Sequence, residues 1–256
     1  MRPEPGLLNQ AVFNNAVWCD TVCRAHGRPG EFAEGLWLNQ HETPRFYPNA
    51  VTLLPDPGSA GQLRGLDPLL AAALPGERAV KDSFCALDLA PRGFRVLFEA
   101  EWLGRTASRT RPVESAPEVD WIRVGAASEL ADWEMAWGGG PVAGQQRIFL
   151  PPLLDDPHVA ILAGYRNQRI VAGAIANRTR QVVGLSNAFV PEADGPGCRA
   201  GCVAAAIDAF PGLALVGYER GRKLDAALAL GFETLGPLRV WVRTQPRQAV
   251  STVARN

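Results

Sequence analysis

The order of strand and helix signals in the second half of the sequence limits the fold most strongly. Three short apolar segments follow one another and indicate strands, at 158–165, 169–177 and 181–190. Asn167-Gln168 predicts a tight hairpin turn between the first two. Helix and strand signals then alternate, with a helix at 198–210, a strand at 213–218, a helix at 222–230 and strand signals at 232–243. A meander followed by alternation predicts a mixed sheet with helices on it, an α/β (α+β) fold.

The first half gives a different pattern. A helix is expected at 7–25, because Leu8, Val12, Ala16, Cys19 and Cys23 fall on one helical face. An extended region at 34–54 follows, then helices at 62–74 and 80–89 and a strand at 94–103. The polar segment 104–117 contains two prolines and is the best linker candidate. We therefore expect two lobes, residues 1–112 and 118–256, with the strand at 121–124 and the helix at 127–137 opening the second.

A weak internal echo supports two related lobes. Gly93-Phe94 with Leu97, Trp102 and Arg105 resembles Gly231-Phe232 with Leu235, Trp241 and Arg243. A helix candidate precedes the glycine in both places, and the linker falls between the copies. The pattern favours a decayed tandem duplication, although chance matches also arise in a glycine-rich chain.

Composition excludes several classes of protein. The 256 residues are 47% hydrophobic and carry 26 basic and 26 acidic side chains, so a nucleic-acid partner is not expected. No apolar run approaches the ~20 residues of a membrane helix, and Met1–Pro5 shows no signal-peptide hydrophobic region. We expect a soluble, cytoplasmic globular protein without membrane partners.

The cysteines are paired in sequence and the lysines are rare. The five cysteines include two C-x-x-x-C pairs, Cys19/Cys23 and Cys198/Cys202, whose spacing fits an apolar helix face better than a zinc site. We therefore expect no metal. Only two of the 26 basic residues are lysines, Lys81 and Lys223, which an arginine-rich codon usage would explain.

A glycine-containing loop between a strand and a helix is the first candidate binding feature. Backbone N–H groups at a helix N-terminus favour anions, and glycines allow close approach. The candidate cradle for a pyrophosphate consists of Phe189, Val190, Gly195, Gly197, Cys198, Arg199 and Ala200. A plain strand-to-helix turn is the alternative.

Residues 119–243 resemble the GNAT superfamily of acyl-CoA-dependent N-acyltransferases. The resemblance is carried by the meander VAILAGYRNQRIVAGAIANRTRQVVGLSNAFVP, the loop and helix after it, and LALVGYERGRKLDAALALGFETLG. Ile170-Val171-Ala172-Gly173 matches the family's hairpin, and Gly231-Phe232 matches the end of its last helix. The resemblance implies tandem lobes of which the C-terminal one is more complete. It also implies a central strand splayed from its neighbour, with the thioester of acetyl-CoA or another acyl-CoA in the gap.

The sequence departs from the family at two motifs. DGPGCRAG replaces the family's Q/R-x-x-G-x-G/A loop, with Arg199 after the second glycine. Ala227 stands where the family often has a tyrosine that protonates the leaving thiolate, so another group or water must do so. Direct attack by an amine mainly needs positioning and a base.

Three residues are candidates for that chemistry. Glu219 ends the strand beside the expected splay and is the candidate base, Tyr218 the candidate acid, and Asn187 on the central strand could orient water or substrate. A solvated strand end and a satisfied polar group are the alternative interpretations.

The predicted function is N-acyl transfer from acyl-CoA to a small-molecule amine. The N-terminal lobe would shape the acceptor side of the cleft. The alternative is a non-catalytic GNAT-like module that binds CoA or a metabolite. The sequence leaves the oligomeric state undecided, with a homodimer as one possibility.

Overall fold

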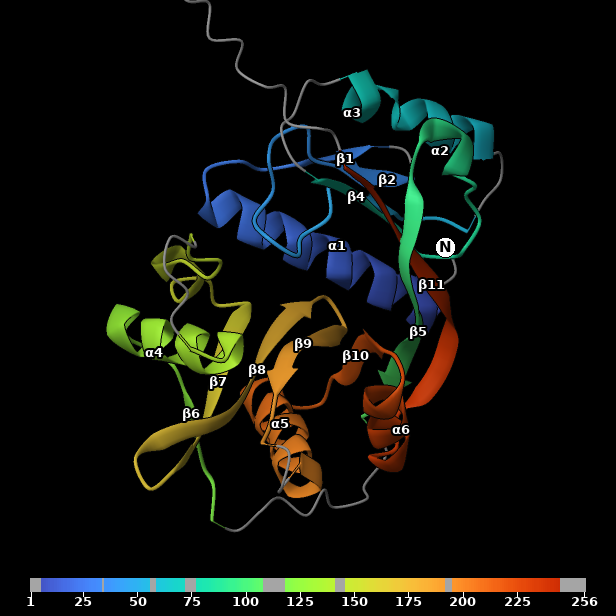
Figure 1. Ribbon diagram of the computed structural model, residues 1–256. Coiled ribbons are helices and arrows are strands. Elements are labelled where there is room, and N and C mark those ends of the chain that lie inside the picture. Colours follow the sequence, from blue (N-terminus) through green and yellow to red (C-terminus); the bar gives the residue numbers. More distant parts are fainter. Residues whose placement is uncertain are drawn as a thin grey trace, which may run out of the picture.

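The computed structural model describes residues 6–33, 35–55, 59–71, 77–107, 118–140, 146–191 and 195–244, and their strands form one mixed sheet (Figure 1). The strand order is β1-β2-β3-β4-β11-β5-β10-β9-β8-β7-β6. The first half contributes β1 (Glu31–Ala33), β2 (Leu36–Leu38), β3 (Ala50–Thr52), β4 (Glu77–Asp82) and β5 (Arg95–Arg105). The second half contributes β6 (Asp120–Arg123), β7 (Val159–Arg166), β8 (Arg169–Thr179), β9 (Val182–Phe189), β10 (Ala214–Glu219) and β11 (Glu233–Thr244).

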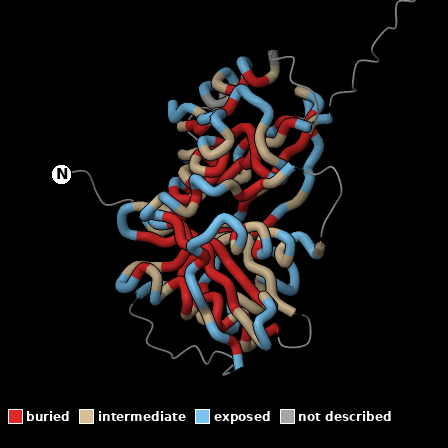
Figure 2. The backbone as a smooth tube through the Cα atoms, turned by 90° about the vertical axis from the view of Figure 1, so that its left-hand side faces the viewer, coloured by how far each residue is buried: buried red, intermediate tan, exposed pale blue. Residues whose placement is uncertain are grey.

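Helices cover the sheet and divide the buried side chains into several cores. The helices are α1 (Leu7–Ala25), α2 (Ser59–Gly65), α3 (Asp67–Ala71), α4 (Ala127–Gly138), α5 (Gly195–Ala209) and α6 (Arg222–Ala229), with short 3-10 turns at Ala90–Arg92 and Pro151–Leu153. Helix α1 crosses the middle of the molecule and contacts β5, β8, β9 and β10 (Figure 1). Buried backbone fills both the upper and the lower part of the molecule (Figure 2). None of the helices in the described residues is long and apolar enough to cross a bilayer.

The two halves of the chain meet at an antiparallel strand pair in the centre of the sheet. Strands β5 and β11 pair antiparallel, and Ala100 faces Leu238, which lies 138 positions later in the chain. The flanking pairs follow the same relation. Phe98 faces Val240 and Trp102 faces Gly236. Gly236 lies 138 positions after Phe98, and Val240 lies 138 positions after Trp102. Residues 138 positions apart therefore exchange places about a local two-fold axis through this pair of strands.

The two glycines of the echo have similar backbone conformations, at the end of the 3-10 turn Ala90–Arg92 and after α6. Gly93 and Gly231 adopt positive φ of 79° and 84°. The following phenylalanines donate their N–H to Leu89 O and Ala227 O, both at 3.2 Å. These are the bonds of a Schellman motif, which glycine permits at low cost. The tryptophans are not counterparts, because Trp102 packs on the α1 side and Trp241 on the opposite side with α2 and α3.

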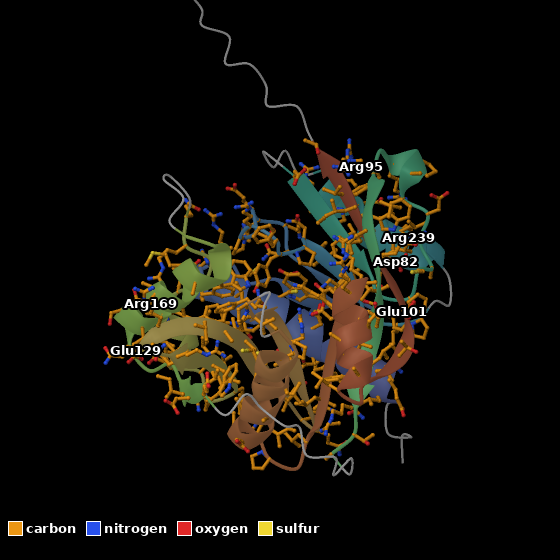
Figure 3. All side chains as sticks on the ribbon, turned by 60° about the horizontal axis from the view of Figure 1, so that its bottom comes forward. Asp82, Arg95, Glu101, Glu129, Arg169 and Arg239 are labelled. Atoms are coloured by element: carbon orange, nitrogen blue, oxygen red, sulfur yellow. The ribbon has the colours of Figure 1, made fainter. Side chains whose placement is uncertain are left out.

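The last strand of each half is inserted among the strands of the other half. Strand β11 lies between β4 and β5, and β5 lies between β11 and β10. Figure 3 labels Asp82 of β4, Arg239 of β11 and Glu101 of β5 on this shared part of the sheet. The division into 1–112 and 118–256 stays a prediction, since residues 108–117 of the expected linker lie outside the described residues.

Three local predictions were wrong. The segment 80–89 is not a helix, because residues 77–82 form β4, which pairs with β11 over six residues. The expected helix 62–74 is two short helices, α2 and α3, and residues 72–74 lie outside the described residues. Gly195 and Gly197 belong to the first turn of α5 instead of a loop before it.

Candidate functional site

The parallel strands β9 and β10 separate after a short ladder. They pair only from Val182/Ala214 to Gly184/Val216. Beyond this point β9 stays paired with β8, and β10 stays paired with β5 as far as Glu219. The splay predicted from the resemblance is therefore present, between 185–189 of β9 and 217–219 of β10.

A β-bulge in β9 accounts for the separation. Asn187 and Ala188 together oppose the single residue Ala174 of β8, and Asn187 has a φ of 54°. A bulge bends its strand and leaves one residue outside the ladder. The backbone at Asn187–Ala188 is thus turned away from regular pairing at the edge of the gap.

Two cavities on opposite sides of the sheet meet at this gap. The narrow cavity, of about 60 Å³, lies between α5 and α6 and is lined by Arg199, Cys202 and Ala227 among others. The wide cavity, of about 270 Å³, lies on the α1 side. The residues that line both are Leu185, Ala188, Val216, Gly217, Tyr218, Glu219 and Lys223.

Glu219 is the carboxylate at the junction. Burial raises the pKa of its carboxyl above the ordinary 4.5, and the positive charges of Lys223 and Arg199 act against this rise. Both cations line the narrow cavity with it. A carboxylate that is desolvated but still flanked by cations has the environment of a general base.

Tyr218 points toward the α1 side of the sheet. Its ring meets the edge of Trp102 with centroids 5.5 Å apart. Lys81 Nζ lies 4.4 Å from the ring centroid and donates a hydrogen bond to Tyr218 Oη at 3.3 Å. Asn187 lines the same wide cavity together with Ser186, whose buried Oγ forms no hydrogen bond with any of the described residues. The structure therefore brings Glu219, Tyr218 and Asn187 to one place.

The candidate cofactor residues separate into two groups. Arg199 lines the narrow cavity, whereas the other six are not among the described residues that line either cavity. Cys198 is fully buried and packs with Val190 and Val119, and Phe189 packs on Trp133 with ring centroids 5.4 Å apart. Gly195, Gly197 and Ala200 lie in the first turns of α5, so their role in cofactor binding stays a prediction.

Sequence reasoning missed the N-terminal residues of the wide cavity. Lys81, Asn15 and Tyr47 all line it, although each lies more than 100 positions before Asn187 and Tyr218 in the chain. The rarity of lysine was the available signal, because both lysines of the chain line this cavity.

Comparisons with solved structures place the fold. Neither a protein-family model nor a curated protein sequence matches the chain. A GCN5-related N-acetyltransferase from Kribbella flavida superposes with a TM-score of 0.65 at 14% identity, over 96% of this chain and 98% of that one. A GCN5-related N-acetyltransferase from Sphaerobacter thermophilus gives 0.55 at 12% identity, over 77% and 72%. A tandem GNAT protein from the clavulanic acid biosynthesis pathway gives 0.50 at 12% identity, over 94% and 97%. At these identities the likeness concerns the fold alone, and the chain has the fold of the GCN5-related N-acetyltransferases (GNAT) in a tandem arrangement.

Proposed function

We propose that the protein transfers an acyl group from acetyl-CoA or another acyl-CoA to an amine. The observation that carries this proposal is the meeting of two cavities, on opposite faces of the sheet, at a gap that contains one desolvated carboxylate, Glu219. Two separate openings onto one point suit a reaction between two substrates that approach from different sides.

The narrow cavity suits the acyl-CoA. Much of its lining is apolar, with Leu103, Val203 and Phe232 among the lining residues, which suits the pantetheine arm. Arg199 and Lys223 supply positive charge at its wall, and the first turn of α5 supplies N–H groups that lack partners within the helix. The thioester would then lie beside the bulge at Asn187–Ala188, where a backbone N–H can polarise its carbonyl.

The chemistry follows from the groups around the gap. Glu219 removes a proton from the ammonium form of the acceptor, and the neutral amine attacks the thioester carbonyl. The new C–N bond forms, the C–S bond breaks, and the thiolate takes up the second amine proton. Tyr218 lines both cavities and would relay that proton, since Ala227 in the narrow cavity has no titratable group.

The test is turnover by a Glu219→Gln variant. The substitution keeps the shape and removes the base, so the rate of CoA thiol release with an amine acceptor should fall tenfold or more, within the ~10²–10⁴ range of general-base catalysis. The affinity for acetyl-CoA should stay nearly the same. An unchanged rate, or no turnover by the native protein with any amine, would favour the non-catalytic alternative.

A further inference from the structure

The wide cavity contains a buried polar group that has no partner among the described residues. Ser186 Oγ forms no hydrogen bond with a described residue, and Ser186 lines the cavity together with Tyr47, whose hydroxyl group is also buried. Tyr47 is only 9% exposed. Since buried hydroxyl groups normally have hydrogen-bond partners, the occupant of this cavity is polar. The cavity has a volume of about 270 Å³, far more than the ~10–15 Å³ that a single water needs.

The same cavity contains a buried positive charge. Lys81 is 4% exposed. Its Nζ donates to Asn15 Oδ1 at 2.6 Å and to Tyr218 Oη at 3.3 Å, which leaves one of its three N–H groups unused. Within the described part of the chain it forms no ion pair with a carboxylate. A buried ammonium without a counter-charge is costly.

The charges around the cavity are unbalanced. Its charged lining residues, among those described, are Lys81, Lys223 and Glu219. Lys223 and Arg199 both act on Glu219, so the negative charge at the gap is already offset by neighbours. Lys81 remains as the cation that no described group of the protein neutralises.

We propose that the acceptor is an amine that also carries a carboxylate, such as an amino acid, and that Lys81 binds this carboxylate. One uncompensated ammonium matches a monoanion, whereas a phosphate carries close to two charges at neutral pH. The amine of the same molecule then faces Glu219. The aromatic rings of Trp18, Tyr47 and Trp102 in the cavity wall suit an apolar side chain. This inference rests on the proposed acyl transfer for its turnover readout.

The test compares amino acids with the amines that lack only the carboxylate. The pairs are phenylalanine with 2-phenylethylamine, leucine with isopentylamine, and tryptophan with tryptamine, each assayed for CoA release from acetyl-CoA. At least one amino acid should exceed its partner amine in kcat/KM by about ten- to hundredfold, the range for a charge-assisted hydrogen bond. An amino-phosphonate analogue of that amino acid should be poorer than the amino acid. Amines that match or exceed every amino acid, or a preferred phosphonate, would overturn the proposal.

Two variants show whether Lys81 is responsible. Lys81→Met should bring the preference close to one. Asn15→Asp keeps the lysine but gives it a carboxylate inside the protein, so it should reduce the preference without loss of folding stability. Lys223→Met, at the other lysine of the cavity, should retain the preference. A preference that is unchanged in both Lys81→Met and Asn15→Asp contradicts the proposal, because a lysine acting only through Tyr218 would slow both members of a pair equally.

Calorimetry separates this inference from the proposed function. If no amine turns over, the same pairs are titrated into the protein with CoA. Tighter binding of an amino acid than of its partner amine would retain the carboxylate site while acyl transfer fails. Equal binding of the two members of each pair, or no binding, would contradict the carboxylate site as well as acyl transfer.

Discussion

The ends of β4 and β10 occupy corresponding positions in the two halves. The end of β10 has separated from its parallel neighbour β9, whereas the end of β4 stays paired with β3. Lys81 pairs with Val240 and Tyr218 pairs with Trp102, and these partners lie 138 positions apart. By the same rule Asp82 corresponds to Glu219, and Val80 to Gly217. The two corresponding strand ends thus have different structures.

In the N-terminal half the corresponding gap is closed. The parallel ladder with β3 includes Ala50/Val80 and Val51/Lys81, at positions where β10 has left β9. Beyond it, Ser83 N–H donates to Thr52 Oγ1 at 2.8 Å. Backbone and side-chain hydrogen bonds therefore occupy the place that the splay occupies in the C-terminal half.

The two acidic residues have different surroundings. Asp82 is fully buried and accepts hydrogen bonds from the backbone N–H groups of Phe84, Ala86 and Leu87, as Figure 3 places it within the β4–β11–β5 region. Glu219 lines two cavities instead. The N-terminal strand end thus uses its carboxylate to hold a turn, whereas Lys81, on the α1 side of β4, lines the wide cavity at the C-terminal gap.

The largest effect is expected from replacing Gly217 of β10 by valine, the residue at the corresponding position of β4, Val80. A Cβ on Gly217 would lie 2.9 Å from Leu185 O, so Gly217→Val should obstruct the junction of the cavities. Turnover should fall by about 10²-fold, the loss typical of misplaced reactants, and acetyl-CoA should no longer raise the melting temperature. Gly125→Val is the matched control, because a Cβ there meets nothing within 4 Å. Full activity in Gly217→Val would show that the gap is not used.

Exchanging the acids for amides should separate structure from chemistry. Asp82→Asn loses at least one of its three backbone hydrogen bonds and should cost about 1–3 kcal/mol of stability, seen as a lower Tm, with little change in kcat. Glu219→Gln should lower kcat with little change in Tm. The same phenotype for both variants would remove the distinction between the two strand ends.

A smaller effect concerns the pH profile. Glu219 acts as a base only when ionised, so the rate should fall as the pH drops through its raised pKa, at a pH above the ordinary 4.5. Lys223 lowers this pKa, so Lys223→Met should move the acidic limb to higher pH. A limb that moves to lower pH, or that persists in Glu219→Gln, would assign it to another group.

The smallest effect concerns the thiols. Cys19, Cys23, Cys198 and Cys202 are buried, and burial raises the pKa of Cys23 and of Cys202 to about 12. Native protein should therefore react slowly with thiol reagents, and Cys85, which is half-buried, should react first. Fast reaction of two or more thiols per chain would contradict this packing.

The sequence predicted those elements that local pattern determines. The apolar spacing through Leu8, Val12 and Ala16 gave the bounds of α1, and both glycines of the helix endings were recognisable. Strand β4 was missed because its strand character comes from pairing with β11, about 160 residues away. The contact of Lys81 with Tyr218 spans 137 residues, so no local motif could place that lysine in the site.

We expect that only one of the two related halves binds acyl-CoA. Isothermal titration of acetyl-CoA into the native protein tests it most directly, with Gly217→Val as the second sample. We expect one molecule bound per chain of the native protein and no binding to the variant. Two molecules per chain, or binding that survives in Gly217→Val, would contradict it.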